Sequence, residues 1–365
     1  MKKISTLLLS AGVLAMTGCT SSEILEEGAP ELRGAISFGT TNVSKPSRAD
    51  NSINNSLFTD FYVFGTYQPT TSSQPVTVFN NEQVHKAENK WTYDGSSRYW
   101  VPGKSYDFYA YSCGNSGYNV NNATNYVTPN LSVRVLNLAN VIADQTHQHD
   151  LLFAKKTNQV RGTEEGGTTG TVSPVDLQFK HIFTRLKFTF TSELPDAKYK
   201  MTISNVRVSG MYNTGFFQGS DESWASTGVN APTKVPTNAS NVPYIDLAVG
   251  DGVVTSAGIA CDPIFVIPYV YSAADVALDF DMDITYNGEE VLGRHIRATW
   301  TPNWIKGQSL NNKINIDLKD ATGLQPIEFK ASIVGDTGAD TEGWVNGTGG
   351  IGSITFEPTV TTPGD

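Results

Sequence analysis

The first residues whose types and spacing specify chemistry lie near the N-terminus. Met16-Thr17-Gly18-Cys19 follows the positively charged pair Lys2-Lys3 and an apolar stretch, residues 4–15. An apolar stretch too short to span a bilayer, followed by small residues and a cysteine, is typical of a signal peptide that ends at an acylated thiol. We therefore expect a lipoprotein signal peptide over residues 1–18 and lipid attachment at Cys19. The alternative is an ordinary cleaved signal peptide with an incidental cysteine.

The other residues that suggest chemistry do not form a recognisable catalytic or metal motif. His147-Gln148-His149-Asp150 would place both imidazoles on one side of a strand, but a catalytic zinc needs a third ligand and none is evident nearby. We interpret His181 as a strand histidine with its hydrogen bonds satisfied. The sequence contains no Gly-x-Ser-x-Gly elbow, Walker loop or zincin helix motif. We therefore predict no catalytic residues, no metal and no cofactor, and hence a protein that is not an enzyme.

Charge and cysteine content exclude further classes. The formal net charge is −10 at pH 7, so nucleic acid would repel the chain and is not an expected partner. After Cys19 only Cys113 and Cys261 remain, one in each half of the chain. This count does not suggest a disulfide framework, and we interpret both as buried small hydrophobic residues.

Alternating apolar and polar residues predict β-strands through most of the chain. Five clear examples are residues 61–67, 106–111, 186–190, 201–208 and 314–318. Glycine-, asparagine- and proline-rich turns separate such segments, and no window shows a sustained helical period with a cap. The fold class predicted from these patterns is all-β, with short strands packed as sandwiches.

The length of 365 residues favours two domains. A short internal similarity supports this, because Trp100-Val101-Pro102-Gly103-Lys104-Ser105 and Trp304-Ile305-Lys306-Gly307-Gln308-Ser309 each precede an alternating strand. Chance similarity of two hairpin turns is the alternative. The boundary is expected in the flexible run 161–173, which gives domains at 49–171 and 172–345.

Beside the lipoprotein motif, a set of short segments follows a recognisable order along the chain. They are Ile36-Ser37-Phe38-Gly39, residues 61–65, Val78-Phe79-Asn80, Trp91-Thr92-Tyr93, Tyr99-Trp100, residues 106–111, 150–154 and 177–186, Phe265-Val266-Ile267-Pro268 and residues 327–331. Taken in this order, the segments resemble the fimbrillin family of Bacteroidetes. The resemblance covers nearly the whole chain.

The resemblance implies two tandem transthyretin-like β-sandwich domains and a structural role in cell-surface pili (fimbriae) that contribute to adhesion. Such pilins reach the outer membrane surface as lipoproteins, here through the Cys19 lipid, and assemble by strand exchange. The expected partners are other pilin subunits, in a homo- or hetero-polymer, and a ligand on host or bacterial surfaces. In β-augmentation of this kind an incoming strand pairs with the open edge of a sheet.

In polymerising members of the family, a protease cuts after an arginine behind the first strand. Residues 19–48 would form a lipidated leader that contains this strand, and Arg48 is the processing candidate. A cut at Arg33 would release the lipid but leave the strand in place, so Arg33 is the weaker candidate. The alternative is that both arginines are ordinary surface residues of an anchor subunit that is not cleaved.

The C-terminal tail, residues 346–365, supplies a candidate donor strand. Ile354, Phe356 and Val360 share one face of an extended segment. Pro358 limits it, because proline cannot donate a hydrogen bond to a central ladder. The alternative is an ordinary final strand of the second domain.

Aromatic content leaves a second function class open. Six tryptophans and fifteen tyrosines could form a sugar-binding surface, so the alternative function is a glycan-binding lipoprotein of the outer membrane surface. Most of these rings occupy strand positions and are expected in the core. The sequence does not distinguish a stalk subunit from an anchor or a tip adhesin.

Overall fold

The computed structural model consists of β-strands joined by turns and loops. It describes residues 35–40, 58–88, 90–114, 127–130, 135–138, 148–161, 173–192, 194, 198–225, 244–269, 276–317, 328–333, 345–346 and 355–358. Within these ranges there is no helix, and therefore none that could cross a membrane. The predicted all-β class is confirmed. Four of the five alternating segments named above lie in strands, and of the fifth, 314–318, residues 314–317 lie in a strand while residue 318 is outside the described residues.

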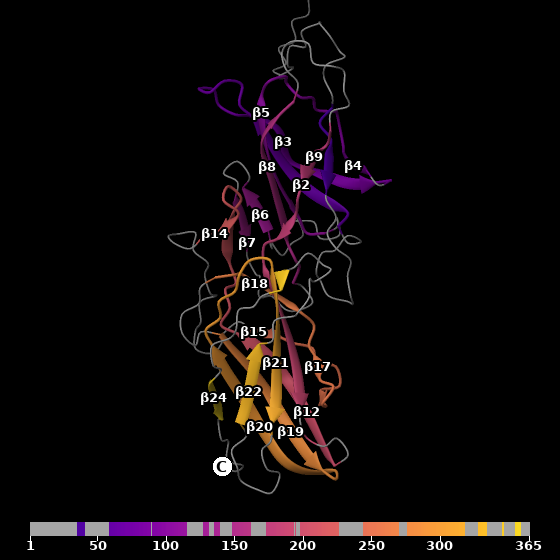
Figure 1. Ribbon diagram of the computed structural model, residues 1–365, viewed down its shortest axis with the longest axis vertical. Helices are drawn as coiled ribbons and strands as arrows, with labels where there is room; N and C mark the ends of the chain where they lie inside the picture. Colours follow the sequence, from indigo (N-terminus) through magenta and orange to yellow (C-terminus); the bar gives the residue numbers. More distant parts are fainter. Residues whose placement is uncertain are drawn as a thin grey trace, which may run out of the picture.

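An eight-stranded sheet occupies one end of the molecule, at the top of Figure 1. Its strands, in spatial order, are β10 (Lys180–His181), β8 (Leu152–Val160), β5 (Ser105–Ser112), β2 (Asp60–Tyr67), β3 (Val76–Ala87), β4 (Lys90–Tyr93), β1 (Phe38–Thr40) and β9 (Val175–Leu177). The pairings are antiparallel except that of β1 with β9, which is parallel.

This sheet curls back on itself to enclose a core. Four strand steps separate β1 from β5, which is about 19 Å in a flat sheet. The ring centroids of Phe38 and Phe108, one on each strand, are nevertheless only 5.8 Å apart. The enclosed core is rich in aromatic side chains, including Phe61 and Phe79. A single curved sheet therefore supplies both walls of the first core.

Two sheets form a β-sandwich in the second half of the chain, at the bottom of Figure 1. One contains β17 (Ile259–Ala260), β11 (Thr184–Ser192), β21 (Gln308–Asp317) and β22 (Glu328–Ile333), with β18 (Ile264–Val266) on β11 and β23 (Val345–Asn346) on β21. The other contains β15 (Tyr244–Asp246), β12 (Tyr199–Ser209), β19 (Val276–Tyr286), β20 (Glu289–Trp300) and β24 (Thr355–Pro358), with β16 (Val253–Val254) on β12.

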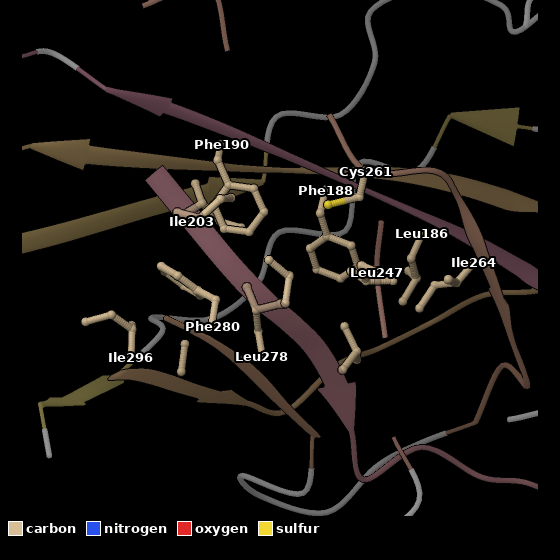
Figure 2. Packing of buried hydrophobic residues seen from close by; sticks show 14 of the residues in the cluster. Leu186, Phe188, Phe190, Ile203, Leu247, Cys261, Ile264, Leu278, Phe280 and Ile296 are labelled. Atoms are coloured by element: carbon tan, nitrogen blue, oxygen red, sulfur yellow. The ribbon is translucent and has the colours of Figure 1, made fainter. Parts of the chain in front are cut away.

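Apolar side chains from the facing sheets fill the space between them. Phe190 of β11 meets Phe280 of β19 edge to face, with ring centroids 5.2 Å apart. Figure 2 shows both rings in this cluster, together with Cys261 beside Phe188. The alternation of inward apolar and outward polar residues along β11 and β19 produces this core directly.

A small antiparallel sheet and a third core connect the two halves. The sheet contains β14 (Ser223–Trp224), β13 (Gly215–Gln218), β7 (Val135–Leu138) and β6 (Val127–Asn130), so that it combines strands from both halves. The third cluster likewise joins Tyr111 and Phe153 to Phe217 and Phe265. Because β9 and β10 belong to the first sheet and β11 to the second half, the chain crosses between Lys180–His181 and Thr184. The boundary at 171/172 stays a prediction.

The two similar tryptophan segments adopt the same turn. Gly103 and Gly307 both have positive φ, +71° and +74°, which glycine adopts without strain. Lys104 donates its backbone N–H to Val101, and Gln308 donates to Ile305, each over 3.2 Å. The shared sequence pattern therefore encodes a shared local structure before β5 and before β21.

Candidate functional site

The first strand lies inside the first sheet and not at its edge. In β1, Phe38 pairs antiparallel with Trp91 of β4 and parallel with Val175 of β9. A further bridge joins Ala35 to Tyr99. The segment predicted as a removable leader strand thus has neighbours on both sides. We call β1 with its neighbours β4 and β9 and the side chains around Phe38 the first-strand site.

Two apolar side chains fix this strand in the core. Ile36 and Phe38 are only 1% and 3% exposed. The Phe38 ring contacts Phe61, Phe79, Tyr93 and Phe108 at centroid distances of 5.8, 5.3, 6.2 and 5.8 Å, all in edge arrangements. Such pairs add to the burial energy of each ring. Phe38 is therefore a central member of the first core.

Tyr93 links the first strand to the segment before β5. Its hydroxyl donates to the carbonyl of Ile36 over 3.0 Å and accepts the backbone N–H of Arg98 over 3.1 Å. The N–H of Ile36 donates to the Arg98 carbonyl over 2.7 Å. On β4, the Trp91 indole Nε1 donates to Thr40 Oγ1 over 2.9 Å. Side-chain hydrogen bonds therefore hold both ends of the short strand.

The Arg98 side chain closes the site from the solvent side. Its guanidinium lies over the rings of Phe79 and Tyr93, at 5.3 and 5.5 Å from their centroids. It also forms an ion pair with Glu82 over 2.9 Å. Both charged side chains are partly exposed, so the pair itself contributes little to stability. Its effect is to orient the guanidinium over the aromatic cluster.

Gly65 allows the rings of this site to approach each other. It lies in β2 where the pairing with β3 shifts register. A Cβ at this position would come within 2.9 Å of the Phe108 ring and 3.0 Å of the Phe79 ring. The sequence shows a glycine inside an alternating strand, which is a signal for close approach or a bulge, but it does not identify the rings.

The C-terminal segment pairs with the β-sandwich in the second half of the chain. In β24, which is the last strand in its sheet order, Phe356 pairs antiparallel with Ala298 of β20 and Pro358 pairs with Ile296. An end position in the sheet is compatible with a proline. The candidate residues Cys19, Arg33, Arg48, Ile354 and Val360 lie outside the described residues.

The histidine and aspartate singled out in the sequence form a contact that spacing did not reveal. The Nδ1 atom of His181 lies 2.7 Å from Asp150 Oδ2, and both side chains are buried. Asp150 also accepts the backbone N–H of Leu151 over 2.8 Å. Among the residues that the structure describes, no three His, Cys, Asp or Glu side chains gather as metal ligands. Thirty-one positions separate this pair, so no local pattern could have predicted it.

The cysteines of the described chain have no disulfide. Burial raises the pKa of the Cys113 and Cys261 thiols to about 12, with a smaller contribution from a neighbouring aspartate in each case. Such thiols react slowly because the thiolate is the nucleophile. Cys261 is buried in the core of the second half, as expected, whereas Cys113 is only partly buried.

Comparison with known proteins assigns a family to this arrangement. Residues 47–333 match the family model described as fimbrillin-like. The fold resembles the crystal structure of a fimbrial protein from Bacteroides vulgatus, with a TM-score of 0.55 and 14% identity over 83% of this chain and 98% of that one. A putative cell adhesion protein from Bacteroides uniformis aligns with a TM-score of 0.46 and 17% identity over 84% and 99% of the two chains. No curated protein matches by sequence.

Proposed function

The chain belongs to the fimbrillin-like family, and from this premise we propose that it is a structural subunit of cell-surface pili that assemble by strand exchange. In this proposal it is exported as a lipoprotein acylated at Cys19, reaches the outer membrane surface, and contributes to adhesion. Its partners are other pilin subunits, the membrane through the lipid, and a surface ligand. It carries out no catalysis.

One observation carries the proposal: a five-residue segment around the first strand and one in the C-terminal tail have nearly the same sequence. Gly34-Ala35-Ile36-Ser37-Phe38 and Gly352-Ser353-Ile354-Thr355-Phe356 share the glycine, the isoleucine and the phenylalanine. At the two other positions alanine is replaced by serine and serine by threonine, which are changes of small size. Ile36 and Phe38 are the side chains that fill the first-strand site. The C-terminal segment of another copy therefore has the residues needed to replace them.

Removal of the first strand would create a strong binding site. Ile36 and Phe38 are almost completely buried, and each contributes about 1.5–3 kcal/mol by leaving water. An empty site therefore lacks about 3–6 kcal/mol of apolar burial and leaves β4 and β9 without their common partner. Ile354 and Phe356 of a neighbouring copy would restore both the burial and the backbone hydrogen bonds.

The position of Arg48 suits the release of this strand. It lies between the last residue of β1, Thr40, and the first residue of β2, Asp60. A cut after Arg48 would leave β1 attached only by its noncovalent contacts. A cut after Arg33 would leave β1 joined to the rest of the chain. In this proposal the lipidated leader blocks polymerisation until the protein has reached the surface.

The shared sequence also predicts the register of the exchanged strand. If Phe356 replaces Phe38, Glu357 replaces Gly39, which pairs with Asp176 of β9. Cysteines in place of Glu357 and Asp176 in one chain should therefore form a disulfide between successive copies, because paired Cα atoms lie within the range that a disulfide bridges. A ladder of covalent oligomers on a non-reducing gel is the expected result.

The matched control moves one cysteine by two residues along the strand. Cysteines in place of Thr355 and Asp176 keep both positions on the same side of the sheet but separate them by about 7 Å more along the strand. This pair should give no ladder. Fibres seen by electron microscopy without a ladder from the first pair would contradict the register, whereas absence of fibres from the unsubstituted protein would contradict the proposed function.

Processing is tested separately by the N-terminus of the protein recovered from fibres. It should begin at Ala49 if cleavage after Arg48 opens the site. Replacing Arg48 with alanine should then keep β1 in place and abolish polymerisation, while the same replacement at Arg33 should not. Fibre subunits that keep an acylated Cys19 would rule out cleavage as the opening step and favour an anchor role.

A further inference from the structure

A polar hollow lies on the outer face of the second sandwich. It has a volume of about 450 Å³ and is formed by side chains of β12, β15, β19 and β20, on the side of this sheet that faces away from the core. Every residue that lines it carries a polar or charged side chain. None of these strands belongs to the first-strand site, but β24 of the C-terminal segment pairs with β20 alongside Arg297.

A β-bulge in β12 creates the hollow. The pairing with β19 shifts between Ser204 and Arg207, where β12 has one more residue than its partner. Asn205 occupies this position with φ of +52°, in the left-handed region that asparagine tolerates better than most residues. Without the extra residue the alternation would turn Arg207 toward the core. The bulge instead places Asn205 and Arg207 together on the outer face.

Hydrogen bonds hold the polar groups of the hollow in fixed orientations. Asp281 accepts the Asn205 amide over 2.6 Å and contacts His295 Nδ1 over 2.7 Å. Arg297 donates to both carboxylate oxygens of Asp279, over 2.8 and 2.9 Å. A carboxylate has about four lone-pair sites and a guanidinium has five N–H donors. Donors and acceptors of both kinds therefore remain directed toward the hollow.

Tyr244 supplies an aromatic surface at the rim. Its side chain is 43% exposed although tyrosine is a large, mainly apolar residue. The guanidinium of Arg207 lies 4.5 Å from its ring centroid, and Arg207 is itself held by Asp246 over 2.8 Å. This stacking fixes the orientation of the ring before any ligand arrives.

The charges of the hollow argue against an anion or a metal ion as ligand. The guanidinium groups of Arg207 and Arg297 already face the carboxylates of Asp246 and Asp279, so an anion would find no unpaired cation. A metal ion would need several free ligands, and the described residues contain no cluster of three His, Cys, Asp or Glu suited to one. A neutral ligand rich in hydroxyl groups can use donors and acceptors at once.

We propose that this hollow binds a neutral sugar residue of a glycan, with one face of the sugar against Tyr244 and its hydroxyls bonded to Asp279, Asp281 and the nearby arginines. A hydroxyl is both a donor and an acceptor, which matches the alternating groups of the hollow. The sugar ring presents apolar C–H groups on its faces, which matches an exposed aromatic ring beside them. The binding is of the weak, single-residue kind that repeated subunits of a surface polymer strengthen through multivalency.

Saturation-transfer NMR on the purified protein tests this assignment. The probes are the methyl glycosides of glucose, galactose, mannose and N-acetylglucosamine at about 10 mM, a concentration suited to millimolar affinity, with N-acetylneuraminic acid and glucosamine as charged comparators. We expect a saturation-transfer signal from at least one neutral glycoside. The proposal would be overturned if no neutral glycoside gave a signal, or if only the charged comparators did.

Three variants locate the binding. Tyr244→Ala should weaken the affinity at least about ten-fold. Asp281→Asn keeps the shape of the side chain but removes its charge. It should weaken the affinity several-fold and also lower the melting temperature slightly, because the carboxylate is held by Asn205 and His295. Tyr286→Ala is the matched control, because this exposed tyrosine packs against Tyr199 outside the hollow and its loss should leave the affinity unchanged. Equal binding by the Tyr244 and Tyr286 variants would show that the sugar binds elsewhere.

Discussion

Replacing Phe38 with alanine in the chain that still carries its leader tests whether the first strand is part of the core. The ring of Phe38 is 3% exposed and contacts four other aromatic rings. Truncation of a buried phenylalanine to alanine typically costs about 3–5 kcal/mol of unfolding free energy, because apolar burial is lost and a cavity remains. A whole domain has only about 5–15 kcal/mol of stability.

The loss should be local, because the molecule has separate core clusters. Hydrogen exchange followed by mass spectrometry can measure it peptide by peptide. A loss of about 3 kcal/mol corresponds to roughly 100-fold faster exchange through opening of the site. We expect this acceleration in peptides that contain β4 and β9, the two neighbours of β1. Peptides from β19 in the second sandwich should exchange at the unchanged rate.

Tyr99→Ala provides the matched control for this measurement. The backbone of Tyr99 pairs with Ala35, in the same segment as Phe38, but its side chain is 51% exposed. Its removal should change the local stability by less than about 0.5 kcal/mol. If Phe38→Ala changed exchange in β4 and β9 no more than Tyr99→Ala does, β1 would not be a core strand. The strand-exchange proposal would then lose its energetic basis.

Three further predictions follow from single positions. Gly65→Ala should destabilise the first half of the chain by about 1–3 kcal/mol in urea titrations, because two phenylalanine rings would have to move. The Asp281 carboxyl has a pKa below its ordinary value, owing first to its hydrogen bond with Asn205; this stabilisation is present at neutral pH and is lost as the pH falls through the lowered pKa. Carbon-13 NMR titration should therefore show a higher Asp281 pKa in Asn205→Ala. Cys113 and Cys261, with pKa values near 12, should resist iodoacetamide at pH 8 in the folded protein and react once urea unfolds it.

The alternation of apolar and polar residues in the sequence was sufficient to predict the strands. Segments such as 186–190 have apolar residues at every second position, and the structure places them in strands with one face in a core. The Ile36-Ser37-Phe38 pattern likewise predicted a strand whose apolar side chains are buried. A period of two is a local property of the backbone, so a short window contains all the information needed.

The local sequence pattern was not sufficient at the β-bulge in β12, where one extra residue changes which side chains face outward. In β12 the extra residue at Asn205 turns Arg207 outward, toward Asp279. Two consecutive polar residues, Ser204 and Asn205, interrupt the alternation in the sequence, but they do not show which strand lies opposite. Only the pairing with β19 shows that β12 has one residue more than its partner at this point. The sequence alone therefore did not locate the polar hollow.

The strands, their buried faces, the acidic charge and the candidate strand segments could all be predicted from the sequence. Which strands are neighbours could not, because it depends on the tertiary structure. Phe38 and Val175 are paired although 136 residues separate them, and Asp150, just before β8, contacts His181 of β10. Closing a loop costs free energy that grows only with the logarithm of its length, so sequence distance hardly restricts the choice of partner. That choice depends on how side chains from the whole chain fit into a common core, which no local window contains.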